Sequence, residues 1–141
     1  MIISKSKGKE MSFEQLNYFQ SKLSFEMDSS DLYVSLNNNE DIIIIDGRSP
    51  EAYEKEHIPG AINLPHNEIC ANLTNKLDKT KTYVCYCDGI GCNGSTKTAL
   101  KLLTLGFTVK ELIGGLDWWK RDSYQTEGLN PQNGLSIQCG C

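Results

Sequence analysis

Arginine is scarce in this 141-residue chain, which has 14 basic and 18 acidic residues and a formal net charge of -4. Only Arg48 and Arg121 are arginines. Because nucleic-acid-binding domains carry clustered basic residues, this composition excludes a nucleic-acid partner. Apolar runs are also short: none approaches the roughly 20 residues of a membrane helix, and no signal-peptide stretch follows MIISKSKGKE. We therefore expect no membrane partner and a soluble, cytoplasmic protein.

The chain has enough apolar residues for one compact domain. A hydrophobic content of 39% over 141 residues allows most of the apolar surface to be buried, whereas a second full domain would need a longer chain. We expect an N-terminal extension with an amphipathic helix over residues 1–30, the main domain over 31–128, and a flexible, cysteine-containing tail over 129–141.

Six cysteines form the most unusual part of the composition: Cys70, Cys85, Cys87, Cys92, Cys139 and Cys141. In a reducing compartment, reactive or metal-binding thiols are more common than a structural disulfide framework. The cysteines lack the paired C-x2-C spacing of a structural zinc site, and the only histidines are His57 and His66. We therefore expect neither a metal nor another cofactor.

The N-terminal part of the sequence predicts a helix. Ser12 and Gln15 stand where a capping box would begin it. Leu16, Phe19 and Leu23 then keep one apolar face, for which we expect packing in the core; an interface between two copies is the alternative. Leu32 and Leu36 predict a second, shorter helix that ends before the polar run NNNE.

The stretch DIIIIDGR contains four consecutive isoleucines and predicts a strand buried on both faces, as in a parallel sheet. Further strands are expected at 61–65, 81–86 and 109–114. Helices are expected over 50–56, with Ser49 as N-cap, over 66–77, and from the cysteine-rich loop to Gly106. Because strands and helices alternate, the fold class is α/β, with a central, mostly parallel sheet flanked by helices.

The stretch YVCYCDGIGCNGSTKT joins one of these strands to the next helix. Ligand sites of parallel sheets lie beyond the carboxyl ends of the strands, and Cys87 stands at that position. A helix that begins near Asn93 would point its free N–H groups and its positive dipole end at the loop, which favours a thiolate. Cys85 lies two residues earlier on the strand and is expected in the core.

Two longer motifs give the chain a family resemblance. DGRSPEAYEKEHIPGAINLP and ELIGGLDWWKRDSY are similar to the first and closing motifs of the single-domain rhodaneses, the thiosulfate sulfurtransferase family. The resemblance runs from about Leu32 to Gly128 and implies a three-layer fold around a parallel sheet. The loop resembles that of a subgroup with a longer, two-cysteine loop, and the family's catalytic cysteine maps to Cys87.

The implied reaction is a ping-pong transfer of sulfane sulfur. Cys87 would take a sulfur atom from a donor such as thiosulfate and pass it from a persulfide to cyanide or a thiol; a sulfur-relay protein is a further candidate partner. By resemblance, backbone amides around the sulfur form the substrate-binding cradle. Its residues are Asp88, Gly89, Ile90, Gly91, Cys92, Asn93, Gly94 and Ser95, with Lys97 adding positive charge. Asp46 and Arg48, which leave a strand end on alternate residues, are expected to brace the pocket.

The loop departs from related folds in having no arginine between Cys87 and the helix. Phosphatases that share this fold need an arginine there to hold phosphate oxygens bidentately, and Lys97, the first basic residue, is only a point charge. The sequence therefore favours sulfur chemistry over phosphate or arsenate chemistry.

The roles of Cys92 and of the two tail thiols stay open. Cys92 is either an alternative nucleophile, a resolving thiol that attacks the persulfide on Cys87, or a spectator. Cys139 and Cys141 form a dithiol that could accept sulfur, reduce a loop disulfide or bind Cu(I), or have no role. The alternative function for the whole chain is a non-enzymatic module that binds a partner protein or a soft metal through its thiols.

Overall fold

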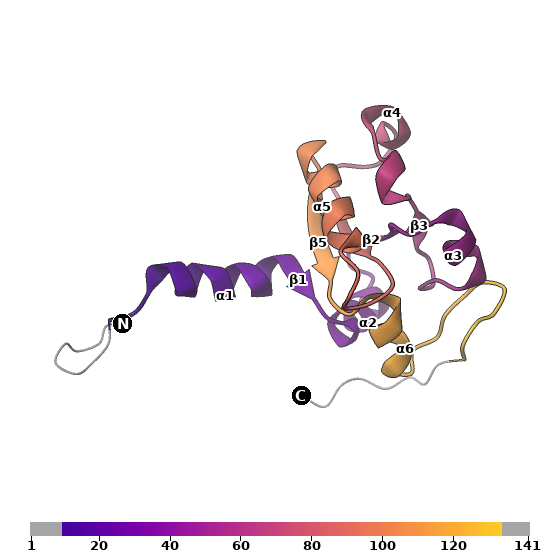
Figure 1. Cartoon of the computed structure of the whole chain (residues 1–141), viewed down its shortest axis with the longest axis horizontal. Coiled ribbons are helices and arrows are strands. Elements are labelled where there is room, and N and C mark those ends of the chain that lie inside the picture. The colour runs from indigo at the N-terminus through magenta and orange to yellow at the C-terminus, as the bar shows by residue number, and fades with distance from the viewer. Residues whose placement is uncertain (1–9, 134–141) are drawn as a thin grey trace.

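The computed structural model describes residues 10–133 and contains a five-stranded sheet (Figure 1). All neighbouring strands are parallel and lie in the order β1-β5-β4-β2-β3. The strands are β1 (Glu26–Met27), β2 (Ile42–Asp46), β3 (Ile62–Asn63), β4 (Thr82–Tyr86) and β5 (Thr108–Leu112). This confirms the predicted α/β class. β1 was not predicted, because two residues are too few for a recognisable pattern.

Helices cover both faces of the sheet. They are α1 (Phe13–Phe25), α2 (Ser29–Asn37), α3 (Pro50–Lys55), the 3-10 turn η1 (His66–Glu68), α4 (Ala71–Thr74), α5 (Gly94–Thr104) and α6 (Gly115–Arg121). One apolar cluster joins the sheet to α2, α3 and α6, and a second joins it to α5 and the segment that holds η1 and α4. Neighbouring side chains of β2 point to opposite faces of the sheet, so Ile44 belongs to the first cluster and Ile45 to the second. The strand is therefore buried on both faces, as predicted.

Local capping signals place the helix starts as the sequence predicted. Ser12 accepts a hydrogen bond from the N–H of Gln15 at 3.2 Å, and Ser49 accepts one from the N–H of Ala52 at the same distance. Pro50 occupies the first turn of α3. A serine oxygen satisfies one of the helix's unpaired N–H groups in each case, so these starts are set by the local sequence.

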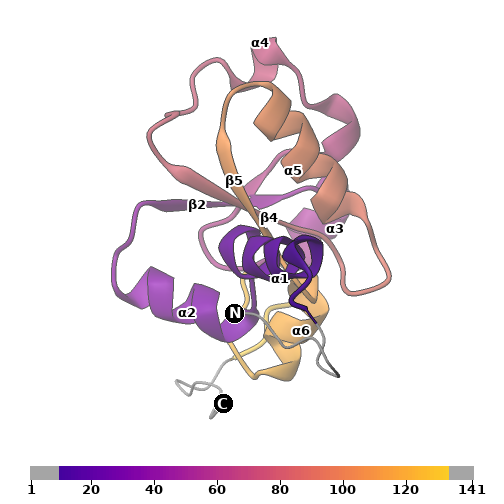
Figure 2. The ribbon, with the colours of Figure 1, turned by 90° about the vertical axis from the view of Figure 1, so that its left-hand side faces the viewer.

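The prediction that the apolar face of α1 packs in the core is wrong. None of its residues is buried: Phe19 is 56% and Leu23 84% exposed. The reason is topological. The chain leads from α1 directly into the edge strand β1, so α1 lies outside the sheet and projects from the rest of the molecule (Figure 1, Figure 2).

The predicted helix over 66–77 is also wrong. After η1 the backbone is extended at Ile69 and Cys70, and α4 is only four residues long. A β-branched residue followed by cysteine has low helix propensity, and Ile69 packs against the second apolar cluster from this extended segment. Core contact thus overrides the weak helical pattern. The predicted strand at 61–65 likewise shortens to Ile62–Asn63.

The segment after α6 returns to α3. The N–H groups of Leu129 and Asn130 donate to the carbonyl oxygens of Glu54 and Lys55 at 3.0 and 2.9 Å.

Cys139 and Cys141 lie outside the described residues. In the described part of the chain, every helix is too short or too polar to cross a membrane.

Candidate active site

The site lies where two neighbouring strands end side by side. Asp46, the last residue of β2, is in register with Tyr86, the last residue of β4, and the N–H of Gly47 donates to the carbonyl oxygen of Tyr86 at 3.0 Å. From here the chain passes through α3 to β3 on one side and through α5 to β5 on the other. Such a switch point opens a crevice beyond the strand ends, and Cys87 and Arg48 both emerge there.

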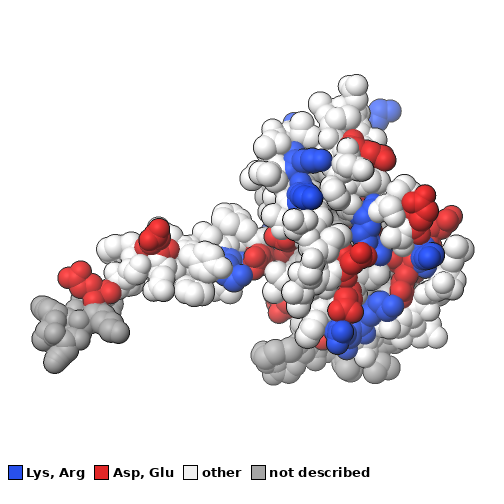
Figure 3. Space-filling model, viewed as in Figure 1, with Lys and Arg blue, Asp and Glu red and all other residues white. Residues whose placement is uncertain are grey.

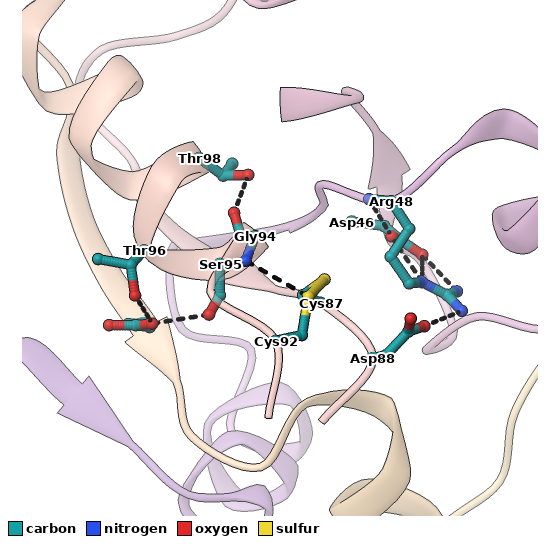
Figure 4. Close-up of a disulfide and its surroundings, with 10 residues drawn as sticks. Asp46, Arg48, Cys87, Asp88, Cys92, Gly94, Ser95, Thr96 and Thr98 are labelled. Atoms are coloured by element: carbon teal, nitrogen blue, oxygen red, sulfur yellow. Dashed lines mark hydrogen bonds and ion pairs between the residues drawn. A yellow bond between two sulfur atoms is a disulfide. The ribbon is translucent and has the colours of Figure 1, made fainter. Parts of the chain in front are cut away.

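Cys87 and Cys92 are joined by a disulfide across the loop after β4 (Figure 4). The N–H of Cys92 donates to the carbonyl oxygen of Gly89 at 3.1 Å, which closes a tight turn between the two cysteines. Cys87 is only 6% exposed, whereas Ile90 at the tip of the loop is 78% exposed. The structure thus brings together the two thiols that the sequence left as alternatives, and shows the loop in its oxidised form.

The N-terminus of α5 faces both sulfur atoms. The N–H of Gly94 donates to Sγ of Cys92 at 3.4 Å, and Asn93, the N-cap residue, does not cap the helix with its side chain. A Cβ atom on Gly94 would lie 2.6 Å from Sγ of Cys87. Only glycine therefore allows the helix start to approach the Cys87 sulfur this closely, and the positive end of the helix dipole favours negative charge on the sulfur.

The N-terminus of α6 holds the same loop from another direction. The N–H groups of Leu116 and Asp117 donate to the carbonyl oxygens of Cys87 and Asp88 at 3.0 and 2.8 Å. Gly115 has a φ of 56°, and a Cβ there would overlap the carbonyl oxygen of Cys87. The backbone that carries the nucleophile is therefore fixed between two helix termini.

Asp46 and Arg48 form a buried ion pair, as expected. Nη2 of Arg48 lies 2.7 Å from Oδ2 of Asp46, and the side chains are 7% and 0% exposed. The hydroxyl of Tyr86 also donates to Asp46 at 2.8 Å. Burial opposes the Arg48 charge, but the hydrogen bonds and negative charge of Asp46 outweigh it and raise the pKa of the guanidinium. Arg48 also contacts the exposed Asp88 at 3.3 Å, which ties the β2 end to the Cys87 loop.

Cys85 lies in the core, as predicted. Its side chain is completely buried in the second apolar cluster. Burial, followed by the charge of Glu111, raises the pKa of Cys85 to about 12. The thiol therefore stays protonated at neutral pH and is not a competing nucleophile.

Cys87 lines two separate cavities. The larger, about 310 Å³, lies toward β2 and is lined by Arg48, His66 and Asp88 among others. The smaller, about 150 Å³, lies toward β5 and is lined by Cys92, Gly89 and Ser95 among others. In Figure 4, Arg48 and Asp88 accordingly lie on one side of the disulfide, and Ser95 and Thr96 on the other. Cys87 thus borders one cavity that Cys92 does not line.

The structure places most of the predicted cradle residues near the two sulfur atoms, and their role in binding a substrate stays a prediction. Residues 88–94 form the loop and the start of α5 around the sulfur atoms, but the hydroxyl of Ser95 donates to Oε2 of Glu111 at 2.6 Å, as does that of Thr96. Lys97 is exposed and lines neither cavity. Sequence reasoning missed Glu111 and the α6 amides, since no local motif marks residues that only the sheet order brings to the loop.

Comparison with known proteins identifies the family of the domain. The rhodanese-like domain model matches residues 29–122. The thiosulfate sulfurtransferase PspE of Escherichia coli K12 is 38% identical over 73 residues, which cover 51% of this chain and 68% of that protein. The thiosulfate sulfurtransferase GlpE of Coxiella burnetii is 39% identical over 82 residues, which cover 57% and 73%.

A solved structure extends the likeness further. The BH2092 protein of Bacillus halodurans superimposes with a TM-score of 0.81 at 40% identity, covering 90% of this chain and 93% of that one. A span of that length includes most of α1 as well as the domain itself. With a matched family model, the same fold and a cysteine at the end of the middle strand, the chain belongs to the rhodanese-like domain family.

Proposed function

We propose that this protein is a sulfurtransferase that carries sulfane sulfur as a persulfide on Cys87. The observation that carries the proposal is the position of Cys87, whose sulfur lies against the start of α5 and which lines a cavity beside Arg48. The names of the two curated relatives support sulfur transfer, and thiosulfate, the donor in those names, is the donor that we propose.

In the first half-reaction, the reduced Cys87 thiolate attacks the outer sulfur of thiosulfate. A Cys87–sulfur bond forms, the bond between the two thiosulfate sulfurs breaks, and sulfite leaves with the electron pair. In the second half-reaction, cyanide, a thiol or a sulfur-relay protein takes the outer sulfur, and the thiolate is restored. The Cys87 thiolate lies beside the start of α5, since a Cβ on Gly94 would be 2.6 Å from its Sγ, and the positive end of the helix compensates its charge.

The larger cavity is the proposed donor entrance. Arg48 and His66 line it with Cys87, but Asp46 and Asp88 pair with the guanidinium. The residues from Asp88 to Thr98 include no arginine. Without a bidentate ligand for an oxyanion in the loop, backbone amides are the main compensation for charge on sulfur. The arrangement therefore suits a sulfur anion better than a phosphate.

The test is a single turnover with thiosulfate after the protein has been reduced and the reductant removed. We expect one sulfite per chain and, in the earliest samples after mixing, alkylated at once, a one-sulfur mass gain on the peptide that contains Cys87. Cys87→Ser should release no sulfite, whereas Cys70→Ser, which replaces an exposed thiol in the η1–α4 segment, should behave as the parent. Failure to release sulfite with thiosulfate, and failure to gain sulfur from polysulfide, would leave the non-enzymatic binding module as the better hypothesis.

A further inference from the structure

We infer that Cys92 resolves the persulfide on Cys87, so that the protein also reduces sulfane sulfur to sulfide. This inference rests on the proposed function. Cys92 reaches Cys87 without a rearrangement of the strands or helices, because the disulfide between them is the state that the structure shows. The sulfur of Cys92 also accepts a hydrogen bond from the N–H of Gly94 at 3.4 Å, which favours its attacking, thiolate form.

The two cavities give the attack its direction. In thiol–disulfide exchange the entering sulfur, the attacked sulfur and the leaving sulfur lie nearly in line. Cys92 lines the smaller cavity and is not among the residues that line the larger one. A transferred sulfur atom that enters beside Arg48 is therefore on the far side of Cys87 from Cys92, in the leaving position.

The reaction balances with one external reductant. Cys92 attacks Sγ of Cys87, the Cys87–Cys92 bond forms, and the bond to the outer sulfur breaks. Hydrosulfide leaves with the electron pair and with the proton of the Cys92 thiol. A dithiol, small or protein-borne, then reduces the disulfide by two electrons. The net reaction converts thiosulfate and a dithiol into sulfite, hydrosulfide and the oxidised dithiol.

A single turnover without external thiol separates this step from transfer itself. The parent protein should release one sulfite and one hydrosulfide per chain and end as the Cys87–Cys92 disulfide. Cys92→Ser should still release sulfite, although its position in the loop can change the rate of release, and should retain the persulfide at least about 10-fold longer. Cys70→Ser is the matched thiol control, since Cys70 is exposed and lines neither cavity of Cys87.

Each outcome decides a different claim. If neither the parent nor Cys92→Ser releases sulfite, the proposed function itself fails. If both release sulfite and both keep the persulfide equally long, sulfur transfer stands and the role of Cys92 is refuted. Peptide mapping that finds Cys87 joined to Cys139 or Cys141 in place of Cys92 would refute it as well.

A separate observation, the exposed helix α1, points to an interaction surface. Figure 3 shows that α1 projects with few charged residues along it. Its large apolar side chains are exposed by more than half: Phe13 71%, Tyr18 57%, Phe19 56%, Leu23 84% and Phe25 61%. Because residues on a helix are spaced by about 100°, Tyr18 and Phe25 share one face, and Phe19 and Leu23 share a second face about 130° further around the helix.

The first of these faces borders an apolar groove. Tyr18 and Phe25 line it with Leu103 of α5, Phe107 and Val109, and its volume is about 540 Å³. The second face, with Phe19 and Leu23, is not among the residues that line this groove, and both side chains are more than half exposed. The chain therefore exposes an apolar helix face and an apolar groove at the same end of the sheet.

We propose that a second copy of this chain covers both features. In a two-fold dimer, the α1 face that carries Phe19 and Leu23 in each copy would pack against the apolar groove of the other copy. At about 150–250 Å² for a buried aromatic side chain, the exposed parts of the four α1 aromatics offer about 500 Å² per copy. Two-fold symmetry doubles this area to about 1,000 Å², the lower bound of a specific interface, before any leucine is included. A symmetric dimer uses helix and groove of both copies at once, whereas a different partner would need its own matching pair of surfaces.

The mass of the full-length protein in solution tests the dimer. Light scattering after size-exclusion chromatography should give twice the 15.8 kDa chain mass, and Phe19→Glu with Leu23→Glu should give the monomer. Asn17→Glu adds one negative charge on the side of α1 that faces away from Phe19 and Leu23, and this variant should remain dimeric. A parent protein that is still monomeric at about 100 µM, well above the Kd of even a modest interface, would refute the proposal.

Discussion

Replacing Gly94 with alanine is expected to slow sulfur transfer about 100-fold, because misplacing a reacting atom by about 1 Å can cost that much. The added Cβ would lie 2.6 Å from Sγ of Cys87, 3.3 Å from its Cβ and 3.4 Å from Sγ of Cys92. Cβ atoms in proteins do not come as close as 2.6 Å to a neighbouring heavy atom, so either the nucleophile or the start of α5 has to move. Steady-state kcat/KM for thiosulfate with cyanide as acceptor measures the effect.

Gly91→Ala is the matched control, since it makes the same substitution three residues earlier in the same loop. A Cβ on Gly91 would meet no atom within 4 Å, so its kcat/KM should stay within about 3-fold of the parent. Alanine has a higher helix propensity than glycine by about 1 kcal/mol, and Gly94→Ala is thus not expected to unfold α5. Equal activity of the two variants would show that the close approach of α5 to Cys87 does not matter for transfer.

Replacing Asp46 with asparagine should lower the free energy of unfolding by about 3–5 kcal/mol, the usual cost of breaking a buried ion pair. The substitution preserves shape but leaves the Arg48 guanidinium, 7% exposed, without the charge that compensates for its burial. It also weakens the hydrogen bond that the Tyr86 hydroxyl donates to the carboxylate. Urea denaturation followed by circular dichroism gives the unfolding free energy.

Asp88→Asn provides the comparison, because Asp88 contacts the same guanidinium at 3.3 Å from a side chain that is 73% exposed. Exposed ion pairs contribute about 0–1 kcal/mol, so this variant should be nearly as stable as the parent. Similar losses for the two variants, or a loss below about 1 kcal/mol for Asp46→Asn, would contradict the assignment of the buried pair as the main brace of the site.

Local signals explain what could be predicted from the sequence. The isoleucine run of β2, the serine caps of α1 and α3, and the position of Cys87 between a strand and a helix depend on neighbouring residues, and the structure has them where the sequence placed them. Features that depend on distant residues could not be predicted. The contact of Glu111 with Ser95 and the α6 amides on Cys87 exist only because β5 lies beside β4.

The error over α1 has a different origin. An apolar stripe on a helix shows only that the stripe needs a partner, and core packing and assembly give the same pattern. The point where the helix joins the sheet decides between core packing and assembly. Strand β1 sets this point, and its two residues are too few to be recognised as a strand in the sequence. Similarly, the spacing of Cys87 and Cys92 left their pairing open, because it depends on the turn that the Cys92 N–H closes with Gly89.

The brevity of the outer strands also affects how these molecules behave when they are crowded. Both β1 and β3, at the two edges of the sheet, are only two residues long. A short edge offers few unpaired backbone groups to a strand from another molecule, so growth of the sheet from chain to chain is disfavoured. Self-association is thereby directed away from open-ended, fibre-like stacking and toward closed contacts between side chains.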